Sequence, residues 1–388
     1  MRTVRDIPVL ENIPVLVRAA LNVPVENGEV VSDYRLRRAL PTIRFLAERG
    51  ARVVLISHLG QQGTETLAPV AKALGVLARD VSFCSETVGG RPRSAIRDLA
   101  PGAILVLENL RRNRGEQENN REFAEELAAL ADIFVEDCFD TCHRRHASIV
   151  SVPEFLPSYA GFLLEEEVRE LASARSPKSP SLAVIGGAKF STKEAVLKAL
   201  LACYDHVFVG GALANDFLKW SGQEVGKSLV SDGAEASHIK TLLDNPKLVL
   251  PMDSLVISAK SFGSINALSE ARVATRGHVQ PDEIILDHGP GTVSHLSRLA
   301  EKARTILWNG PLGNYENGFV AATDGFARAV ATTAAHSVVG GGDTVAAIEN
   351  LGLLPHFSFV STGGGAMLEY LAKGTLPGID ALDVHPSA

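Results

Sequence analysis

The sequence predicts an α/β protein made of two doubly wound parallel-sheet domains. Three observations support this fold class. The chain has 388 residues, enough for about two domains at roughly 150 residues each. Short apolar, β-branched runs recur along it and alternate with longer segments of helical periodicity, the pattern of βαβ units around a parallel sheet. A Glu-rich helical segment separates two series of such runs.

The first series predicts an N-terminal domain over residues 1–160. Strands are expected at 14–18, 53–56, 104–107 and 133–135, and helices at 35–49 and 119–130. Apolar strands bounded by turn signals and alternating with amphipathic helices indicate one α/β domain. Residues 161–180 are expected to form a linking helix and hinge, because Pro177 and Pro180 end the helical pattern.

The second series predicts a C-terminal domain over residues 181–371. Its strands are expected at 182–185, 207–209, 248–250, 284–286, 305–308, 337–339 and 357–360.

Composition narrows the class of protein. Hydrophobic residues make up 46% of the chain and charged residues 21%, which is typical of a globular enzyme rather than a disordered chain. The net charge of −7 provides no global positive field for nucleic acid or an anionic membrane, so neither partner is expected. No apolar run approaches the ~20 residues of a membrane span, and the start lacks the apolar stretch of a secretory signal.

We therefore expect a cytoplasmic protein. Its four cysteines, Cys84, Cys138, Cys142 and Cys203, are too few and too irregularly spaced for a disulfide framework, which suits a reducing compartment.

Glycine clusters follow four apolar runs of the second half, where strands end and helices begin. They are Gly186-Gly187, Gly210-Gly211, Gly340-Gly341-Gly342 and Gly363-Gly364-Gly365. Glycine lets the backbone approach a ligand closely, and the first N–H groups of the next helix favour an anion. One glycine pair alone would indicate only a tight turn, but four glycine clusters on one sheet predict a polyphosphate pocket. None has the spacing of a Walker A or dinucleotide-binding loop.

Charged residues flank these glycines. Lys189 and Lys193 lie four apart just past Gly187, so at a helix start both ammonium groups would share one face and could clamp phosphates. Asp343 follows three glycines, where its carboxylate could hold Mg²⁺ or simply cap the helix.

The first half supplies arginines instead: Arg18, Arg35, Arg111 and Arg144, with His58 and His143 near strand ends. Guanidinium groups bind carboxylate and phosphate bidentately, so a convergent set would hold a small, highly anionic substrate. The spacing of these arginines in the sequence does not show that their side chains meet at one site. The alternative is that each arginine lies on the surface in contact with solvent.

Nine collinear segments together resemble the phosphoglycerate kinase family, essentially from end to end. They are VRAALNVP (17–24), SHLG (57–60), LENLR (107–111), TCHR (141–144), GGAK (186–189), GKSL (226–229), WNGP (308–311), GGGDT (340–344) and STGGG (361–365). The resemblance implies two α/β domains facing across a cleft and closing about the linking helix. The N-terminal domain would bind 3-phosphoglycerate, and the C-terminal domain would bind Mg-ATP or Mg-ADP. The C-terminal tail, residues 372–388, would pack back on the first domain.

The resemblance also implies the roles of individual residues. Arg35 would be the catalytic arginine, Lys189 would track the transferring phosphoryl group, and the helix N-termini at Gly342 and Gly365 would donate N–H groups to it. The acceptor would be bound by Asn22, His58, Arg111 and Arg144. The nucleotide would be bound by Lys193, Asn309, Glu316 (at the ribose), Gly341, Asp343 and Thr344, with Asp343 also the Mg²⁺ ligand. The protein would be a monomer with two partners, a small anionic carboxylate and a nucleotide.

The chain departs from the family pattern mainly on the acceptor side. Ala20 stands where the family has an Asp that contacts the substrate, Gln61 where it has an Arg, and Asp140 where it has a Gly. Arg112, Arg114 and Arg145 are unusual neighbours that could restore positive charge. On the nucleotide side, Ala212, Asp216 and Gly291 also differ from the pattern.

Three functions remain open at this point. The asymmetry of the departures favours an ATP-dependent carboxylate kinase whose acceptor differs from 3-phosphoglycerate. The second is the ordinary glycolytic phosphoglycerate kinase, and the third is a nucleotide-binding pseudoenzyme. Separately, Cys138, Cys142, His143 and His146 have the residue types of a zinc site at compressed spacing, although small buried thiols explain the cysteines better.

Overall fold

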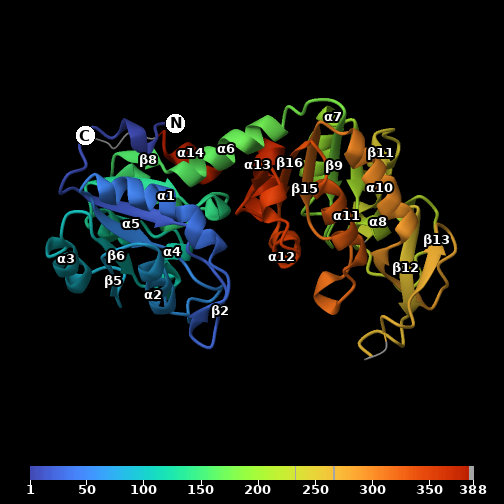
Figure 1. Cartoon of the computed structure of the whole chain (residues 1–388), viewed down its shortest axis with the longest axis horizontal. Coiled ribbons are helices and arrows are strands. Elements are labelled where there is room, and N and C mark those ends of the chain that lie inside the picture. The colour runs from blue at the N-terminus through green and yellow to red at the C-terminus, as the bar shows by residue number, and fades with distance from the viewer. Residues whose placement is uncertain (232, 265–266, 384–388) are drawn as a thin grey trace. The chain divides into compact units, whose positions relative to one another are not determined.

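The computed structural model describes residues 1–231, 233–264 and 267–383. It contains two compact units, one formed by Met1–Arg169 with the described residues from Thr375 onward, the other by Glu170–Gly374. Each unit is built around its own six-stranded sheet (Figure 1).

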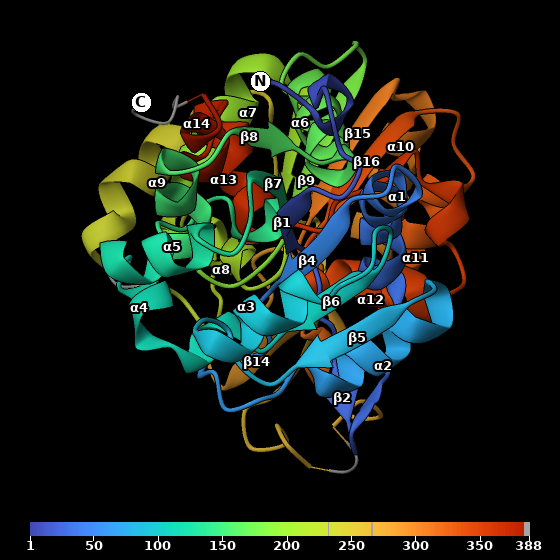
Figure 2. The same cartoon turned by 90° about the vertical axis from the view of Figure 1, so that its left-hand side faces the viewer.

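The sheet of the first unit is parallel throughout, with the order β5-β6-β4-β1-β7-β8. Figure 2 shows β5, β6, β4 and β1 side by side. Its strands are β1 (Pro14–Ala19), β4 (Arg52–Ile56), β5 (Val81–Cys84), β6 (Ile104–Leu107), β7 (Ile133–Asp137) and β8 (Ser158–Ala160). Its helices include α1 (Tyr34–Glu48), α2 (Ala68–Leu77), α3 (Gly90–Arg97), α4 (Arg114–Gln117) and α5 (Arg121–Ala128), and β2 (Val25–Glu26) pairs with β3 (Glu29–Val30) in a small hairpin.

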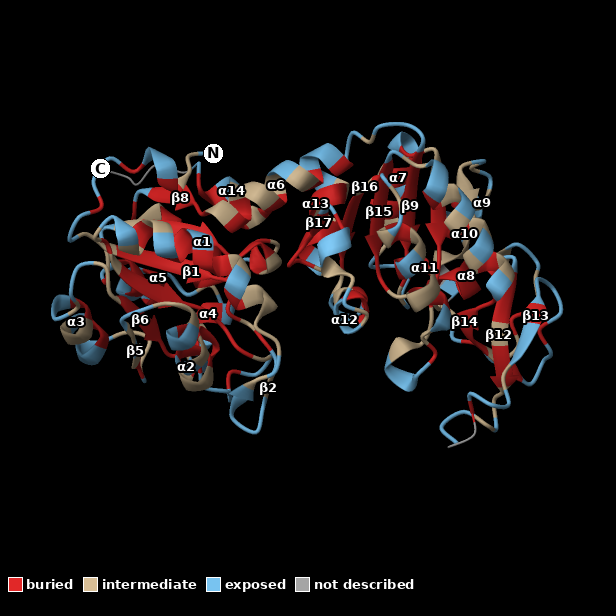
Figure 3. Ribbon diagram, in the orientation of Figure 1, coloured by how far each residue is buried: buried red, intermediate tan, exposed pale blue. Residues whose placement is uncertain are grey.

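The central strands of this sheet are buried on both faces. Val15, Leu16 and Val17 of β1 are fully buried, as the near-continuous apolar run predicts. Figure 3 shows the strands as the buried layer beneath more exposed helices. Because parallel strands end together, residues following β1, β4, β6 and β7 gather at one edge of the sheet.

The chain returns to the first unit at its C-terminal end. Helix α14 (Pro377–Ala381) packs on the π-helical turn η4 (Ala147–Ser151), and the Gly378 N–H donates to the Cys142 carbonyl at 2.8 Å. Leu376 and Leu382, on either side of α14, are each 1% exposed.

Helix α6 (Phe162–Ala174) carries the chain from the first unit to the second. It begins on a buried carboxylate, because the N–H groups of Leu163 and Leu164 donate to Asp137 Oδ1 at 2.9 and 3.2 Å. Asp137 thus joins the end of β7 to the start of α6.

The main sheet of the second unit is also parallel, with the order β11-β10-β9-β15-β16-β17. Its strands are β9 (Ser181–Ile185), β10 (His206–Val209), β11 (Leu248–Val249), β15 (Thr305–Asn309), β16 (His336–Gly340) and β17 (Phe359–Val360). Its helices are α7 (Glu194–Cys203), α8 (Leu213–Trp220), α9 (Ala236–Leu243), α10 (Pro290–Lys302), α11 (Ala321–Ala331), α12 (Gly342–Asn350) and α13 (Gly365–Lys373).

One strand expected in this parallel sheet lies elsewhere. The run at 284–286 belongs to β14 (Glu283–His288), which pairs antiparallel with β12 (Asp253–Ser258), itself antiparallel to β13 (Arg272–Thr275). These three strands form a separate sheet with a small core of its own, in which Val256, Ala274 and Ile285 are buried. An apolar run indicates a strand but not its neighbours, which is why the prediction was wrong here.

Candidate active site

Arg18 is the buried centre of the polar cluster at the sheet edge of the first unit. Its Nε donates to Ser148 Oγ at 3.1 Å, and its Nη2 contacts His58 Nδ1 at 3.0 Å. Ser148 is in turn fixed by Glu116, whose carboxylate accepts both its hydroxyl (2.7 Å) and its N–H (2.9 Å). A guanidinium can only donate, so Nδ1 of His58 accepts and the neutral ring carries its proton on Nε2.

His58 is held neutral in this setting. Burial and then the Arg18 guanidinium lower the pKa of His58 well below its usual value, with Arg111 and Arg35 acting in the same direction. A neutral imidazole with a fixed tautomer can donate one hydrogen bond to an anionic ligand without titrating near neutral pH.

Arg35 lies in the first turn of α1, where it contacts two other segments. Its Nη1 donates to Asp140 Oδ2 at 2.7 Å and to the Asn22 carbonyl at 3.2 Å. The Asp140 side chain is only 9% exposed. Burial favours its neutral form, but the Arg35 guanidinium outweighs this and lowers the pKa of Asp140 to about 2. The carboxylate is therefore charged at any pH at which the protein would be assayed.

Arg111 and Asn22 meet on the loop that follows β4. The Asn22 side-chain oxygen accepts the Gly60 N–H at 3.2 Å, and Arg111 Nη1 donates to the Gly60 carbonyl. Burial, then Arg144 and Arg18, lower the pKa of Arg111, so Arg144 acts on the same cluster. Arginines gathered against mutual repulsion are an arrangement that a bound anion would stabilise.

The structure therefore brings the predicted catalytic arginine, Arg35, together with the predicted acceptor-binding residues Asn22, His58, Arg111 and Arg144. Asp140 adds a negative charge directly against one of them. Ala20 is fully buried and packs with Cys138 and Leu163, while Gln61 is exposed.

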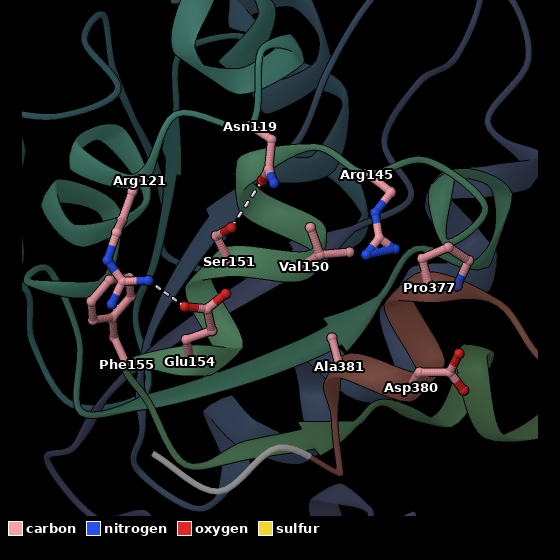
Figure 4. Close-up of a pocket in the computed structure, with 10 residues that line it drawn as sticks. All are labelled: Asn119, Arg121, Arg145, Val150, Ser151, Glu154, Phe155, Pro377, Asp380 and Ala381. Carbon is pink, nitrogen blue, oxygen red and sulfur yellow. Dashed lines mark hydrogen bonds and ion pairs between the residues drawn. The ribbon is translucent and has the colours of Figure 1, made fainter. Parts of the chain in front are cut away.

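Arg112, Arg114 and Arg145 are directed to other places. Arg112 pairs with Glu108 at 2.8 Å, and the 90%-exposed Arg114 pairs with Glu118 at 2.5 Å. Arg145 lines a hollow of about 740 Å³, where Figure 4 shows its guanidinium across from the ion pair of Arg121 and Glu154. The positions of these three arginines therefore do not support the expectation that they replace the arginine missing at position 61.

The cysteines and histidines at 138–146 form no metal site. Among the described residues, no group of three or more His, Cys, Asp or Glu side chains is placed to hold a metal ion. Cys138 and Cys142 are buried free thiols, and the Cys138 S–H donates to Asp140 Oδ1 at 2.8 Å.

In the second unit, the four glycine clusters lie at one edge of the same sheet, as predicted, since they follow β9, β10, β16 and β17. A Cβ on Gly211 would come within 2.8 Å of the Gly187 N and O, so these two turns touch backbone to backbone. Gly341 has φ +96°, a conformation that favours glycine, and its Cβ would lie 3.3 Å from the Gly310 N.

Two helices of nine residues each begin at this edge. Helix α12 starts at Gly342 and α13 at Gly365. A Cβ on Gly364 would lie 3.6 Å from Gly341 Cα, so the two helix starts are adjacent. Their unpaired N–H groups form the kind of edge that binds phosphate.

The two lysines do not share a helix start, contrary to the expectation. Helix α7 begins only at Glu194, so Lys193 is its N-cap residue and Lys189 lies exposed in the preceding loop. Phe190, which lies between the two lysines in this loop, is fully buried. A Cβ on Gly187 would lie 3.8 Å from Lys193 Nζ, which places this ammonium beside the glycine turn.

Oxygen ligands suited to Mg²⁺ are present at the same edge. Asp343 is exposed in the first turn of α12, and Asn309, at the end of β15, has Oδ1 3.6 Å from the position of a Gly341 Cβ. Thr344 Oγ1 is buried without a hydrogen-bond partner among the described residues and lies equally close to that position. Mg²⁺ usually takes one or two carboxylates together with nucleotide phosphates, so the single exposed Asp343 fits a metal that arrives with the nucleotide.

Three further residues named in the sequence analysis are Glu316, Asp216 and Gly291. Glu316 is exposed in the short helix η7 (Tyr315–Asn317), and its ribose contact stays a prediction. Asp216 is buried and accepts the Ser231 N–H and hydroxyl, at 2.6 and 2.8 Å. The Gly291 N–H donates to Asp253 Oδ2 at 2.9 Å, so both departures have structural partners.

Sequence reasoning missed the groups that hold the arginines. Asn109 donates to the Leu59 and Glu65 carbonyls and accepts the N–H of Leu59 and Arg111. An Asn two residues after the end of a buried strand was the available signal. Glu116 and Ser148 have no such local signal, because they meet Arg18 only through the fold.

Comparison with known proteins shows extensive similarity. The phosphoglycerate kinase family model matches residues 4–374. A phosphoglycerate kinase of Rubrobacter xylanophilus is 45% identical over 391 residues, covering 98% of both chains. One of Thermomicrobium roseum is 44% identical, covering 98% of this chain and 99% of the relative. The solved structure of the enzyme from Coxiella burnetii matches with a TM-score of 0.82 at 39% identity, covering 98% of each chain. That from Pyrococcus horikoshii matches with a TM-score of 0.87 at 30% identity, covering 99% of each.

Proposed function

Because the chain belongs to the phosphoglycerate kinase family, and is thus a phosphotransferase with a carboxyl group as acceptor, we propose that it catalyses the family's ordinary reaction. In that reaction the γ-phosphoryl group of ATP passes reversibly to the carboxylate of 3-phosphoglycerate, giving ADP and 1,3-bisphosphoglycerate. The relatives favour this acceptor over a different acid, since those similar over nearly the whole chain are named phosphoglycerate kinase.

The acceptor binds at the arginine cluster of the first unit. His58 Nε2–H, Arg111 and Arg144 hold its phosphate and hydroxyl oxygens, and Asn22 fixes the loop through Gly60. Arg35 aligns the acceptor carboxylate and stabilises negative charge on the phosphoryl group as it moves. Guanidinium donors suit both oxyanions.

The nucleotide binds at the glycine edge of the second unit. Lys193 and Gly341 lie beside the nucleotide phosphates, and Asn309 and Thr344 contribute polar side chains there. Glu316 contacts the ribose. Lys189 follows the transferring phosphoryl group, and the N–H groups at Gly342 and Gly365 face its oxygens. Asp343 would hold Mg²⁺, which neutralises charge on the phosphate oxygens when bound.

The chemistry needs no covalent intermediate with the protein. The acceptor carboxylate oxygen attacks the γ-phosphorus while the bond to the β,γ-bridging oxygen breaks and ADP leaves. Catalysis then consists of aligning these atoms and stabilising the charge that spreads over the phosphoryl oxygens. We place the reaction in the cytoplasm of the cell, which suits the four free thiols, and expect a monomer.

The observation that carries this proposal is the convergence of Arg35, His58 and Arg111 on the sheet edge of the first unit. The test is a coupled assay of 1,3-bisphosphoglycerate formation with 3-phosphoglycerate and Mg-ATP. Arg35→Met should lower kcat by about 100-fold or more. Arg37→Met, on the same helix, breaks only an exposed pair with the N-cap residue Asp33 and should not lower kcat.

A panel of other small carboxylic acids, with hydroxylamine trapping of the acyl phosphate, tests the alternative acceptor. Turnover of another acid above that of 3-phosphoglycerate would replace the proposed substrate. Nucleotide binding without turnover of any acid would indicate a pseudoenzyme.

A further inference from the structure

We propose that Asp140 is a built-in competitor of the acceptor: its carboxylate occupies Arg35 in the free protein and raises the acceptor concentration needed for half-saturation. The inference rests on the proposed function and names what sets acceptor affinity at that site.

The geometry places Asp140 on the arginine that the acceptor needs. Asp140 follows β7 in the turn η3 (Phe139–Thr141), whereas Arg35 comes from α1, 105 residues earlier. Their 2.7 Å contact uses Nη1 of Arg35, the same nitrogen that donates to the Asn22 carbonyl. An acceptor oxyanion approaching this nitrogen therefore meets one already shared between two oxygens.

The carboxylate is held firmly in that position. Its second oxygen, Oδ1, accepts the S–H of the buried Cys138 at 2.8 Å, so both oxygens have donors. The side chain is 9% exposed and that of Arg35 is 26% exposed. An ion pair this far from solvent is screened less by salt than a surface pair.

Charge makes the competition specific to anions. The guanidinium groups of Arg35 and Arg18 keep Asp140 ionised, and its charge in turn cancels part of the field that Arg18, Arg111 and Arg35 produce. A bound phosphate or carboxylate must either displace Asp140 from Arg35 or share the guanidinium with a like charge, and like charges brought together oppose binding.

The alternative role for Asp140 is to orient Arg35 for catalysis. The two roles differ in the kinetic constant they affect. A competitor raises the KM of the acceptor and leaves kcat nearly unchanged, whereas a positioning residue supports kcat.

The experiment compares the full-length protein with Asp140→Asn and Asp140→Glu. Asn keeps the shape and an oxygen for the Cys138 thiol but removes the charge, while Glu keeps the charge. We expect Asp140→Asn to lower the KM for 3-phosphoglycerate by about tenfold, with kcat within about twofold and the KM for ATP unchanged. Asp140→Glu should keep a KM near that of the wild type. Asp98→Asn, which removes the same charge from an exposed pair with Arg97, serves as the matched control.

A calorimetric titration separates this inference from the proposed function. Inorganic phosphate and 3-phosphoglycerate are titrated into each variant without nucleotide. If Asp140→Asn binds both anions more tightly than the wild type, the competitor role of Asp140 is supported even when no turnover is detected. Only the proposed reaction would then be contradicted by the lack of turnover. Unchanged or weaker anion binding, or a fall in kcat at constant KM, would overturn the inference. Thermal unfolding of each variant verifies that it is folded.

Discussion

Burial lowers the pKa of the Lys193 ammonium to about 8, so this residue changes charge within the range in which the enzyme can be assayed. In the proposed nucleotide site, the charged ammonium would attract the phosphates below that pKa, and the neutral amine would not do so above it. We therefore expect the KM for ATP to rise as the pH increases from about 7 to 9, by roughly tenfold if one strong charge contact is lost. Steady-state kinetics at saturating acceptor measure this.

The matched variant is Lys193→Arg, because a guanidinium keeps its charge throughout that range. The KM for ATP of Lys193→Arg should stay constant over the pH range in which that of the wild type rises. If both proteins show the same rise, the titrating group is another one and Lys193 does not bind the phosphates.

At the scale of elements, the backbone at the start of helix α12 has a conformation that a side chain would disturb. Gly341 has φ +96°, and a Cβ there would lie 3.3 Å from the Gly310 N. We expect Gly341→Ala to reorient the first N–H groups of α12 and weaken ADP binding by about tenfold or more, while binding of 3-phosphoglycerate stays unchanged. Calorimetric titration with each ligand measures both effects.

Gly352, just past the end of the same helix, supplies the control. Its φ is +69° and a Cβ there would meet nothing within 4 Å. Gly352→Ala therefore adds positive-φ strain at the other end of the helix and should leave ADP affinity unchanged. Equal losses in the two variants would mean that general destabilisation, not the phosphate edge, is responsible.

The junction between β7 and α6 should make stability depend on pH. Burial raises the pKa of Asp137 to about 7, against 3.8 for the ordinary group, although N–H donors including those of Leu164 and Leu163 act in the opposite direction. Between these values the folded protein binds the proton more tightly than the unfolded chain, so this group's contribution to stability falls as pH rises from about 4 to 7.

We therefore expect Asp137→Asn, which needs no proton, to gain in Tm relative to the wild type as the pH is raised from 5 to 8. Thermal unfolding at several pH values measures the difference between the two proteins, which cancels the other titrating groups. A difference that does not change with pH would contradict the assignment.

The elements also show what the sequence could and could not predict. The glycine clusters after β9, β10, β16 and β17 were predictable because strand, turn and helix start are all local patterns. The antiparallel pairing of β14 with β12 was not predictable, because it depends on a chain segment about 30 residues away. The contact of Arg35 with Asp140 spans 105 residues; the sequence could place the charge near the arginines but not on one particular nitrogen.

At the scale of the whole molecule, the chain crosses from the second unit back to the first after Gly374, so stability of the first unit depends on the last residues. Leu376 and Leu382 are each 1% exposed, and burial of two leucines is worth about 3–6 kcal/mol. We expect a chain ending at Gly374 to unfold its first unit at a lower temperature than the full-length protein. Its affinity for 3-phosphoglycerate should fall, because η4 holds Ser148 against Arg18.

Calorimetric unfolding with each ligand tests this, since a ligand raises the transition of the unit that binds it. In the truncated chain ADP should still raise one transition as much as in the full-length protein, whereas 3-phosphoglycerate should lose most of its effect. The full-length variant with Leu376→Ala and Leu382→Ala should show the same selective loss in a milder form, because it keeps the hydrogen bond from Gly378 to Cys142. Equal loss of both ligand effects would mean that the two units do not unfold separately and that the tail stabilises the molecule as a whole.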